Sequence, residues 1–149
     1  MKLLVILVVL VLLSLGLRLA IPRLGNSVAG GIVEQDGQLM LADCPATPNC
    51  HRDELVVNGE PSQAISTLAD IVRQHDGAEV ISQDERYLHA TFASRLMGFV
   101  DDVEFLLVAG DAGTQPVILV RSASRLGKSD LGANAKRVEM LRGASHQRL

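Results

Sequence analysis

Apolar and polar positions divide the chain into a uniformly apolar start and a longer part in which the two kinds alternate. Residues 3–17 are almost wholly apolar, with Lys2 before them and Arg18 after them. At about 1.5 Å per residue, a helix over this run covers about 22 Å, less than a hydrocarbon core of about 30 Å. A full span therefore requires helix as far as Ile21, with the Arg18 side chain extended to the membrane interface.

We predict that residues 1–24 are either a membrane anchor or a signal segment. A secretory signal peptide also has a basic start and an apolar run, but no clear A-x-A cleavage motif stands near Ala20. The uncleaved anchor, a single transmembrane helix, is therefore preferred. Orientation is weakly encoded, because Lys2 on one side faces Arg18 and Arg23 on the other. We expect the N-terminus in the cytoplasm and the rest of the chain in the periplasm or an equivalent extracytoplasmic space.

Two short segments lead from the anchor into the domain. Residues 25–31, GNSVAGG, are small and read as a flexible tether. An extended piece over residues 32–41 follows, and then a proline-containing loop, CPATPNC, in which regular structure is not expected.

Helical periodicity occurs twice in the remaining chain. Ser62 is the expected N-cap of a helix that ends at Gly77. Ser129 is the expected N-cap of a second helix over residues 130–145. The apolar residues predicted to face the core are Ile65, Leu68 and Val72 in the first helix, and Leu131, Val138 and Leu141 in the second.

Between the two helices, runs of apolar and β-branched residues alternate with turn residues such as QDE and GDAGTQ. These connections are too short for parallel crossovers, so the strands should pair antiparallel. The sequence therefore predicts one α+β domain over residues 32–149, with a four-stranded antiparallel meander and two helices packed on one face. The predicted strands cover residues 79–83, 86–93, 102–109 and 116–123.

Charge narrows the function classes. Beyond the anchor the chain carries 11 basic and 17 acidic residues, a formal charge of −6. Residues 34–111 hold 15 acids and 4 bases, whereas residues 121–149 hold 2 acids and 7 bases. Net negative charge, together with the absence of tryptophan and an aromatic content of 3%, argues against nucleic-acid binding. The basic end is either a surface patch or the counter-charge to its acidic neighbours.

The two cysteines agree with an exported domain. Cys44 and Cys50 are close enough in sequence to close a small disulfide loop in an oxidising compartment. Such a loop stabilises the fold by about 2 kcal/mol on the chain-entropy model. A zinc site is the poorer interpretation, because Cys-x5-Cys followed by His51 misses the usual spacing and no second ligand pair follows. We expect no metal and no cofactor.

Residues 121–132, RSASRLGKSDLG, contain a Gly-Lys-Ser reminiscent of a phosphate loop. The Walker A pattern requires glycine where Ser122 stands, so a phosphate loop of that kind is not expected. A strand, a short loop and a helix start still follow in order, with basic residues beside exposed amides, and this predicts an anion site. The alternative is a helix cap in which Asp130 pairs with Arg125. The candidate anion-binding residues are Arg121, Ser122, Ser124, Arg125, Lys128 and Ser129.

Strand pairing supports a structural role for the same charges. If Ala109 pairs with Pro116, Glu104 lies opposite Arg121, with Asp102 diagonal to it on the same face. An unpaired guanidinium in a strand that is apolar on both faces would be costly, so an ion pair is expected there. The members of this predicted charge network, besides the arginines, are Asp101, Asp102, Glu104, Asp130 and Asn134.

A hydrolase is the enzymatic alternative, with Asp101 or Asp102 as base near Ser122 or Ser124. A serine nucleophile needs a base within hydrogen-bond reach. Spacing places none of the histidines beside a serine. The histidines are His51, His75, His89 and His146.

Three stretches, ADCPATPNC, YLHATFASRLMGFVDDVEF and VRSASRLGKSDLGANAKRVEML, resemble in this order the family known as domain of unknown function 1499. The resemblance implies an exported or membrane-anchored bacterial protein without an established activity. Two departures occur: His51, Arg52 and Asp53 replace the family's usual Val-Ser-Ser, and Ala135 follows Asn134 where the family usually has arginine. The resemblance gives no role to its motif positions, which are Cys44, Cys50, Asp101, Asp102, Glu104, Arg121, Ser122, Ser124, Arg125, Asp130 and Asn134.

These features together predict a membrane-tethered accessory or binding module of the cell envelope. Its expected ligand is an anionic group, such as a lipid headgroup or a carboxylated or phosphorylated metabolite. The membrane is one partner through the N-terminal segment, and an envelope protein is another candidate. The alternatives are the hydrolase and a purely structural partner protein whose charged motifs only hold the fold.

Overall fold

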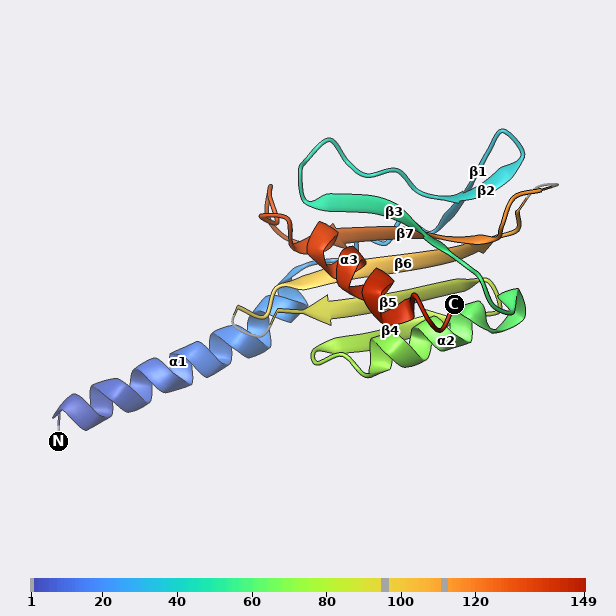
Figure 1. The fold of residues 1–149 in the computed structure, drawn as a ribbon. Helices are drawn as coiled ribbons and strands as arrows, with labels where there is room; N and C mark the ends of the chain where they lie inside the picture. The colour runs from blue at the N-terminus through green and yellow to red at the C-terminus, as the bar shows by residue number, and fades with distance from the viewer. Residues whose placement is uncertain (1, 95–96, 111–112) are drawn as a thin grey trace.

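The computed structural model describes residues 2–94, 97–110 and 113–149, leaving out the side chains of residues 3 and 15–24. Helices and strands follow one another along the chain as shown in Figure 1. Their bounds are α1 (Lys2–Leu24), β1 (Ile32–Gln35), β2 (Gln38–Leu41), β3 (Cys50–Val56), α2 (Pro61–Arg73), β4 (Ala78–Gln83), β5 (Tyr87–Ala93), β6 (Val100–Val108), β7 (Val117–Ser124) and α3 (Ala133–Ser145).

Five strands form one antiparallel sheet in the order β3-β7-β6-β5-β4. The predicted α+β class and the meander from β4 to β7 are confirmed. The prediction of four strands is wrong, because β3 adds a fifth along the free edge of β7. Its sequence, CHRDELV, carries four polar residues in succession and lacks the alternation by which strands are recognised. An edge strand tolerates such side chains because its backbone forms the ladder.

The predicted register between β6 and β7 is confirmed at its central pair, where Glu104 lies opposite Arg121. Along β6, successive side chains point to opposite faces of the sheet. Two residues of the predicted connection between these strands, 111 and 112, lie outside the described residues.

We call the face of the sheet that α2 and α3 cover the inner face (Figure 1). Val103 and Phe105 of β6 are fully buried there. Each fully buried leucine or phenylalanine contributes about 1.5–3 kcal/mol relative to an exposed one, so this layer dominates the stability of the fold. Five of the six helix residues predicted to face the core are buried in it, namely Ile65, Leu68, Val72, Val138 and Leu141.

The start of α2 differs from the prediction. Glu60, not Ser62, is the N-cap, and the Ser62 hydroxyl donates to Glu60 Oε1 at 3.1 Å. Pro61 occupies the first helical turn, where its fixed φ suits the helix and its missing N–H costs nothing. The helix ends at Arg73, before the turn that Gly77 completes with a φ of +77°.

The start of α3 is also corrected. The helix begins at Ala133 rather than directly after Ser129. Gly132 is the N-cap and has no side chain, so Asp130, two residues earlier, supplies the capping bond, and its Oδ2 accepts the Asn134 amide at 2.8 Å. The intervening Leu131 has a left-handed φ of +53° and is 90% exposed, so its predicted place in the core is wrong.

The opposite, outer face of the sheet has a cover of its own. The hairpin of β1 and β2 lies over it, and its Leu41 is 1% exposed against Leu106 and Leu119. The chain between α1 and β1 runs along the same face, through contacts described below. Both faces of the sheet are therefore buried, the inner one by helices and the outer one by irregular chain and a hairpin.

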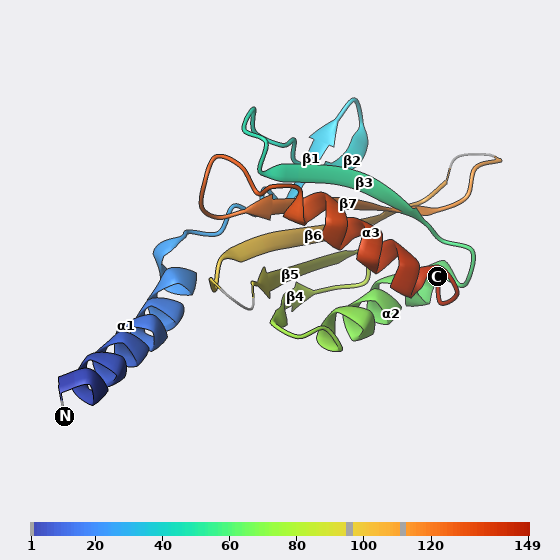
Figure 2. The same ribbon diagram turned by 60° about the vertical axis from the view of Figure 1, so that its left-hand side comes forward.

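α1 projects from the end of the sheet towards which β5 and β7 point (Figure 2). Its large apolar side chains from Leu4 to Leu13 are all 47 to 66% exposed. Across the side chains that the structure describes, no helix is long and apolar enough to cross a membrane. The predicted anchor also depends on Arg18 and Arg23, which lie outside those side chains, and it stays a prediction.

Candidate functional site

Charged residues gather on both faces of the sheet around β6. Asp101 points to the inner face, whereas Asp102 and Glu104 point to the outer face. This separation follows from the alternation of a strand and places two neighbouring carboxylates in different layers. We call the outer group, made of His89, Asp102, Glu104, Arg121 and Arg125, the outer-face ion network.

Glu104 is the first centre of the outer-face ion network and is fully buried. Arg121 Nη1 donates to its Oε2 at 2.9 Å, and the Tyr87 hydroxyl donates to Oε1 at 2.8 Å. The amides of Gly30 and Gly31 donate at 3.0 and 2.6 Å. Burial and the hydrogen bond to this carboxylate raise the pKa of Tyr87 above its usual range. Four donors thus converge on one carboxylate, which explains how its charge is tolerated in the interior.

Asp102 is the second centre and is also fully buried. Arg125 approaches it with Nε and Nη2, both at 2.9 Å, and His89 Nε2 lies 2.8 Å from Oδ1. The Val28 amide and the Ser27 hydroxyl donate at 2.9 and 3.0 Å. Burial by itself raises the pKa of Asp102, but the hydrogen bonds from His89, Arg125 and the Val28 amide lower it well below its ordinary value.

The outer-face ion network therefore fixes the chain that follows α1. Residues 25–31 were predicted to be a flexible tether. In the structure they are hydrogen-bonded to both buried carboxylates. Arg121 Nη1 adds a bond to the Val28 carbonyl at 2.9 Å. These contacts were not predicted, because most of the donors are backbone amides, which leave no side-chain signature in a sequence. The sequence does show the acceptors, because Asp102 and Glu104 alternate along β6.

The inner-face polar cluster consists of Asp101, Ser122, Ser124, Asn134 and Arg137. Arg137 forms an ion pair with Asp101 through Nη2 and donates from Nη1 to Ser122 Oγ at 2.9 Å and Asn134 Oδ1 at 2.7 Å. Ser122 Oγ donates to Asn134 Oδ1 at 2.6 Å, and Asn134 Nδ2 donates to Ser124 Oγ at 3.0 Å. Arg137 was not among the predicted site residues, although it shares a helix face with Asn134 at the i, i+3 spacing.

The predicted disulfide between Cys44 and Cys50 is present. It closes the loop that carries Asn49, whose carbonyl accepts from Asn134 Nδ2 at 3.0 Å. Asn49 Nδ2 in turn donates to the Gly127 carbonyl at 2.9 Å. The disulfide loop thus holds the loop before α3 and braces the inner-face polar cluster.

Most of the predicted anion site is engaged within the protein. Arg121 and Arg125 pair with Glu104 and Asp102, and Ser122 and Ser124 bond to Asn134. The expected pair between Asp130 and Arg125 is wrong. Asp130 instead caps α3, and the amides it accepts there lower its pKa against the opposing effect of burial.

Lys128 and Ser129 are the exposed members of the predicted anion site. For Ser122 and Ser124, the described residues supply asparagine and arginine partners but no histidine or carboxylate partner. The structure therefore gives neither serine the base that a hydrolase requires. The predicted carboxylates Asp101 and Asp102 are both held by arginines.

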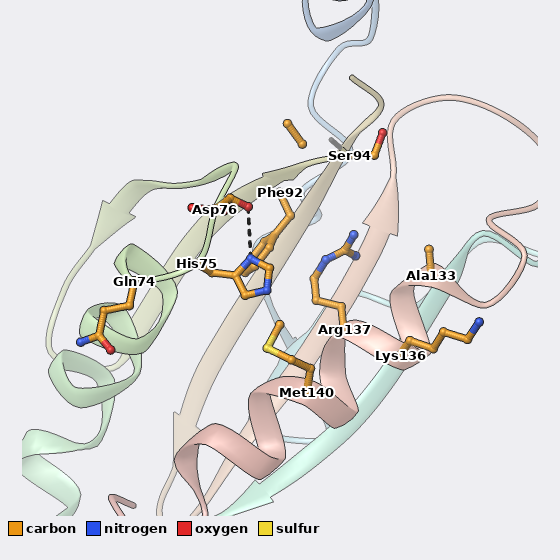
Figure 3. Close-up of a pocket in the computed structure, with 10 residues that line it drawn as sticks. Gln74, His75, Asp76, Phe92, Ser94, Ala133, Lys136, Arg137 and Met140 are labelled. Atoms are coloured by element: carbon orange, nitrogen blue, oxygen red, sulfur yellow. Dashed lines mark hydrogen bonds between the residues drawn. The ribbon is translucent and has the colours of Figure 1, made fainter. Parts of the chain in front are cut away.

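A pocket of about 600 Å³ opens beside the inner-face polar cluster, between the end of α2, β5 and α3 (Figure 3). The Phe92 ring forms its apolar floor and is contacted from two elements. The His75 ring centroid lies 5.5 Å from that of Phe92, and the Arg137 guanidinium carbon lies 5.1 Å from the same centroid. The residues that line the pocket are Gln74, His75, Asp76, Phe92, Ala93, Ser94, Ala133, Lys136, Arg137 and Met140.

The charges around this pocket are not equally available. Arg137 is neutralised by Asp101, so a ligand would share an arginine that is already paired. Lys136 is exposed and, within the part of the chain that the structure describes, forms no ion pair. Figure 3 places it at the edge of the pocket beyond Arg137, one helical position earlier, with its side chain directed away from Phe92. An apolar floor and an unpaired rim cation suit a ligand that is apolar at one end and anionic at the other.

The fold and site define an α+β domain, cross-linked by a disulfide, whose sheet carries a polar cluster on each face. The family model described as protein of unknown function (DUF1499) matches residues 40–144, and the chain belongs to this family. Comparison with curated proteins and with solved structures finds no match. The matched range covers both carboxylate centres and the pocket but begins after residues 25–31, which the outer-face ion network binds.

Proposed function

We propose that the protein is a membrane-tethered binding module of the cell envelope, and that the pocket over Phe92 binds an amphipathic anion. The observation that carries this proposal is the combination, in one cavity, of an apolar floor and an unpaired cation. Phe92 and Met140 supply the apolar surface, and Lys136 supplies a positive charge in a lining that also contains the Asp76 carboxylate. This moves the expected anion site away from the loop over residues 121–129, where most polar groups already have partners.

The expected binding free energies favour an amphipathic ligand over a simple anion. One ion pair at about 4 Å in water is worth about 1 kcal/mol, which by itself gives no useful affinity. Each methylene buried against the pocket floor adds about 0.8 kcal/mol. A six-carbon chain therefore contributes several times more than the charge, while the charge at Lys136 selects which amphiphile binds. Lipid headgroups with their first acyl carbons have this chemistry.

Two observations support a tethered protein of the cell envelope. Among the side chains that the structure describes, those from Leu4 to Leu13 are apolar and exposed, and a uniformly apolar helix is a membrane-binding segment. The disulfide between Cys44 and Cys50 fits an oxidising compartment. We therefore propose a single-pass protein with its domain in the periplasm or an equivalent space.

The test uses the full chain in phosphatidylcholine nanodiscs, with its four methionines labelled at the methyl carbon. Hexyl phosphate is the probe, and inorganic phosphate and hexanol are the two half-ligands. We expect hexyl phosphate to shift the Met140 methyl resonance saturably, with little effect of either half-ligand. Met40, on the outer face, is the internal reference. Equal shifts from hexanol would contradict anion selection, and no shift at all would favour the purely structural alternative.

A matched pair of variants locates the anion. Lys136→Gln removes the rim charge, and Lys128→Gln removes an exposed lysine of the loop before α3. Lys136→Gln should weaken hexyl phosphate binding about fivefold, in proportion to a lost ion pair of about 1 kcal/mol. Lys128→Gln should leave binding unchanged. The reverse result would return the site to the loop over residues 121–129.

A further inference from the structure

Two loops at the end of the sheet nearest α1 expose large apolar side chains. One connects β5 to β6 and the other connects β7 to α3, and they adjoin because Ala93 pairs with Val100 and Asp101 with Ser124. Most surface apolar residues occur singly and need no explanation, but four at one end of a small domain form a candidate contact. They are Met97 (46% exposed), Phe99 (44%), Leu126 (38%) and Leu131 (90%).

Leu131 is held in its exposed position by local structure. Its φ of +53° lies in the left-handed region, which is uncommon for a residue with a bulky side chain. The Asp130 carboxylate accepts the amides of Gly132 and Asn134, at 3.0 and 2.8 Å, and thereby fixes the turn on the C-terminal side. A strained turn that presents a leucine to solvent indicates a role for that side chain outside the folded domain.

The segment that follows α1 is fixed close to these loops. Gly25 follows α1 directly, and a Cβ atom added to it would lie 2.8 Å from Arg125 Cβ. Three residues later, the Val28 amide is bound to the buried Asp102. A flexible linker of seven residues would allow the domain to drift on the order of 15 Å from the end of α1. Here the β7–α3 loop adjoins the first residue after the helix.

We propose that the apolar tips of these two loops rest in the interface of the leaflet from which α1 emerges, so that the domain stands end-on against the membrane. The inference depends on the proposed tether, since only a membrane-embedded α1 brings the loops to a bilayer. Lys128, exposed between Leu126 and Leu131, adds attraction to anionic headgroups. The pattern of apolar tips with an intervening lysine is that of an interfacial contact.

The end-on position also specifies the source of the ligand proposed above. Ser94, at the start of the β5–β6 loop, lines the pocket over Phe92, and Figure 3 shows it on the side of the pocket that faces the blue N-terminal segment. With the loop tips in the interface, the pocket mouth lies at headgroup depth. The amphipathic anion is then a membrane lipid and not a solute of the surrounding compartment.

Because the sequence contains no tryptophan, single tryptophans report depth without background. The full chain is reconstituted in vesicles of phosphatidylcholine and phosphatidylglycerol that carry brominated acyl chains. Leu131→Trp and Phe99→Trp are the test variants, and Val56→Trp is the control. Val56 is 48% exposed in β3 and pairs with Val117, at the far end of the sheet. We expect at least a twofold loss of emission for the two test variants and no loss for the control.

Flotation of the same vesicles separates the two proposals. A chain that floats with its lipid while neither test tryptophan is quenched beyond the control overturns the end-on contact and leaves the tether standing. A chain that does not float overturns both. Two test positions on different loops guard against local misfolding of either variant, and quenching at one loop alone would restrict the contact to that loop.

Discussion

Asp101 and Asp102 are neighbours in β6, yet they belong to two regions with different properties. Asp102 is 0% exposed, has all its partners within the protein and lies under the chain that follows α1. Asp101 pairs with Arg137, which lines an open pocket. The same types of residue close one face of the sheet and border a cavity on the other. Charge alone therefore does not identify a binding site; groups without partners next to a cavity do.

The largest difference between the two faces should appear on removing Glu104. Glu104→Ala leaves Arg121 buried without its carboxylate and frees two backbone amides. We expect the free energy of unfolding to fall by about 3–5 kcal/mol. Denaturant titration of the full chain in a nonionic detergent measures this loss, and Glu79→Ala, at an exposed position of β4, is the control. A loss no greater than that of the control would show that the outer-face ion network is dispensable.

An intermediate effect is expected from the titration of Asp102. Hydrogen bonds from His89, Arg125 and the Val28 amide hold its folded-state pKa below the unfolded value of about 3.9. The unfolded chain therefore binds the proton first, so the stabilising contribution is present above about pH 4 and is lost as the pH falls below it.

The measurement is the free energy of unfolding between pH 2 and 7, for the parent protein and for the Asp102→Asn variant. The variant should be about 2–3 kcal/mol less stable at pH 7, as expected for a broken charge-assisted network, and the gap should narrow in acid. Parallel curves for the two proteins would contradict this assignment of the acid sensitivity.

The smallest effect is expected on the inner face. Asp101→Asn removes the charged partner of Arg137, but water in the adjoining pocket can hydrate the guanidinium. Arg137 also keeps its bonds to Ser122 and Asn134. We expect a loss of about 1 kcal/mol in the same detergent titration. A loss as large as that of Glu104→Ala would mean that the two faces do not differ in the way proposed.

Sequence patterns predicted the parts of this fold that depend on side-chain periodicity. The meander, the buried faces of α2 and α3 and the pairing of Glu104 with Arg121 follow from alternation and helical spacing. The edge strand β3 was missed because its charged side chains are allowed only by its position. Leu131 was misplaced because a left-handed turn interrupts the apparent helical period.

The candidate site was less predictable for a physical reason. A basic cluster and its acidic partners are both visible in a sequence. Whether each charge is paired with another depends on distances that the fold sets. Arg121 and Arg125 are bonded to Glu104 and Asp102, whereas Lys136 was not singled out. That Lys136 forms no ion pair among the described residues, and that a cavity lies beside it, can be read only from the three-dimensional structure.

The contacts between residues 27–31 and β6 also have a consequence for the order of folding. They join groups 73 to 75 positions apart in sequence. During synthesis the N-terminal segment emerges first, and its amides wait for β6 before they find their acceptors. Contacts of such long sequence separation form slowly because loop closure precedes any gain from the contact. We therefore expect the outer face to close late in folding, after the meander has formed.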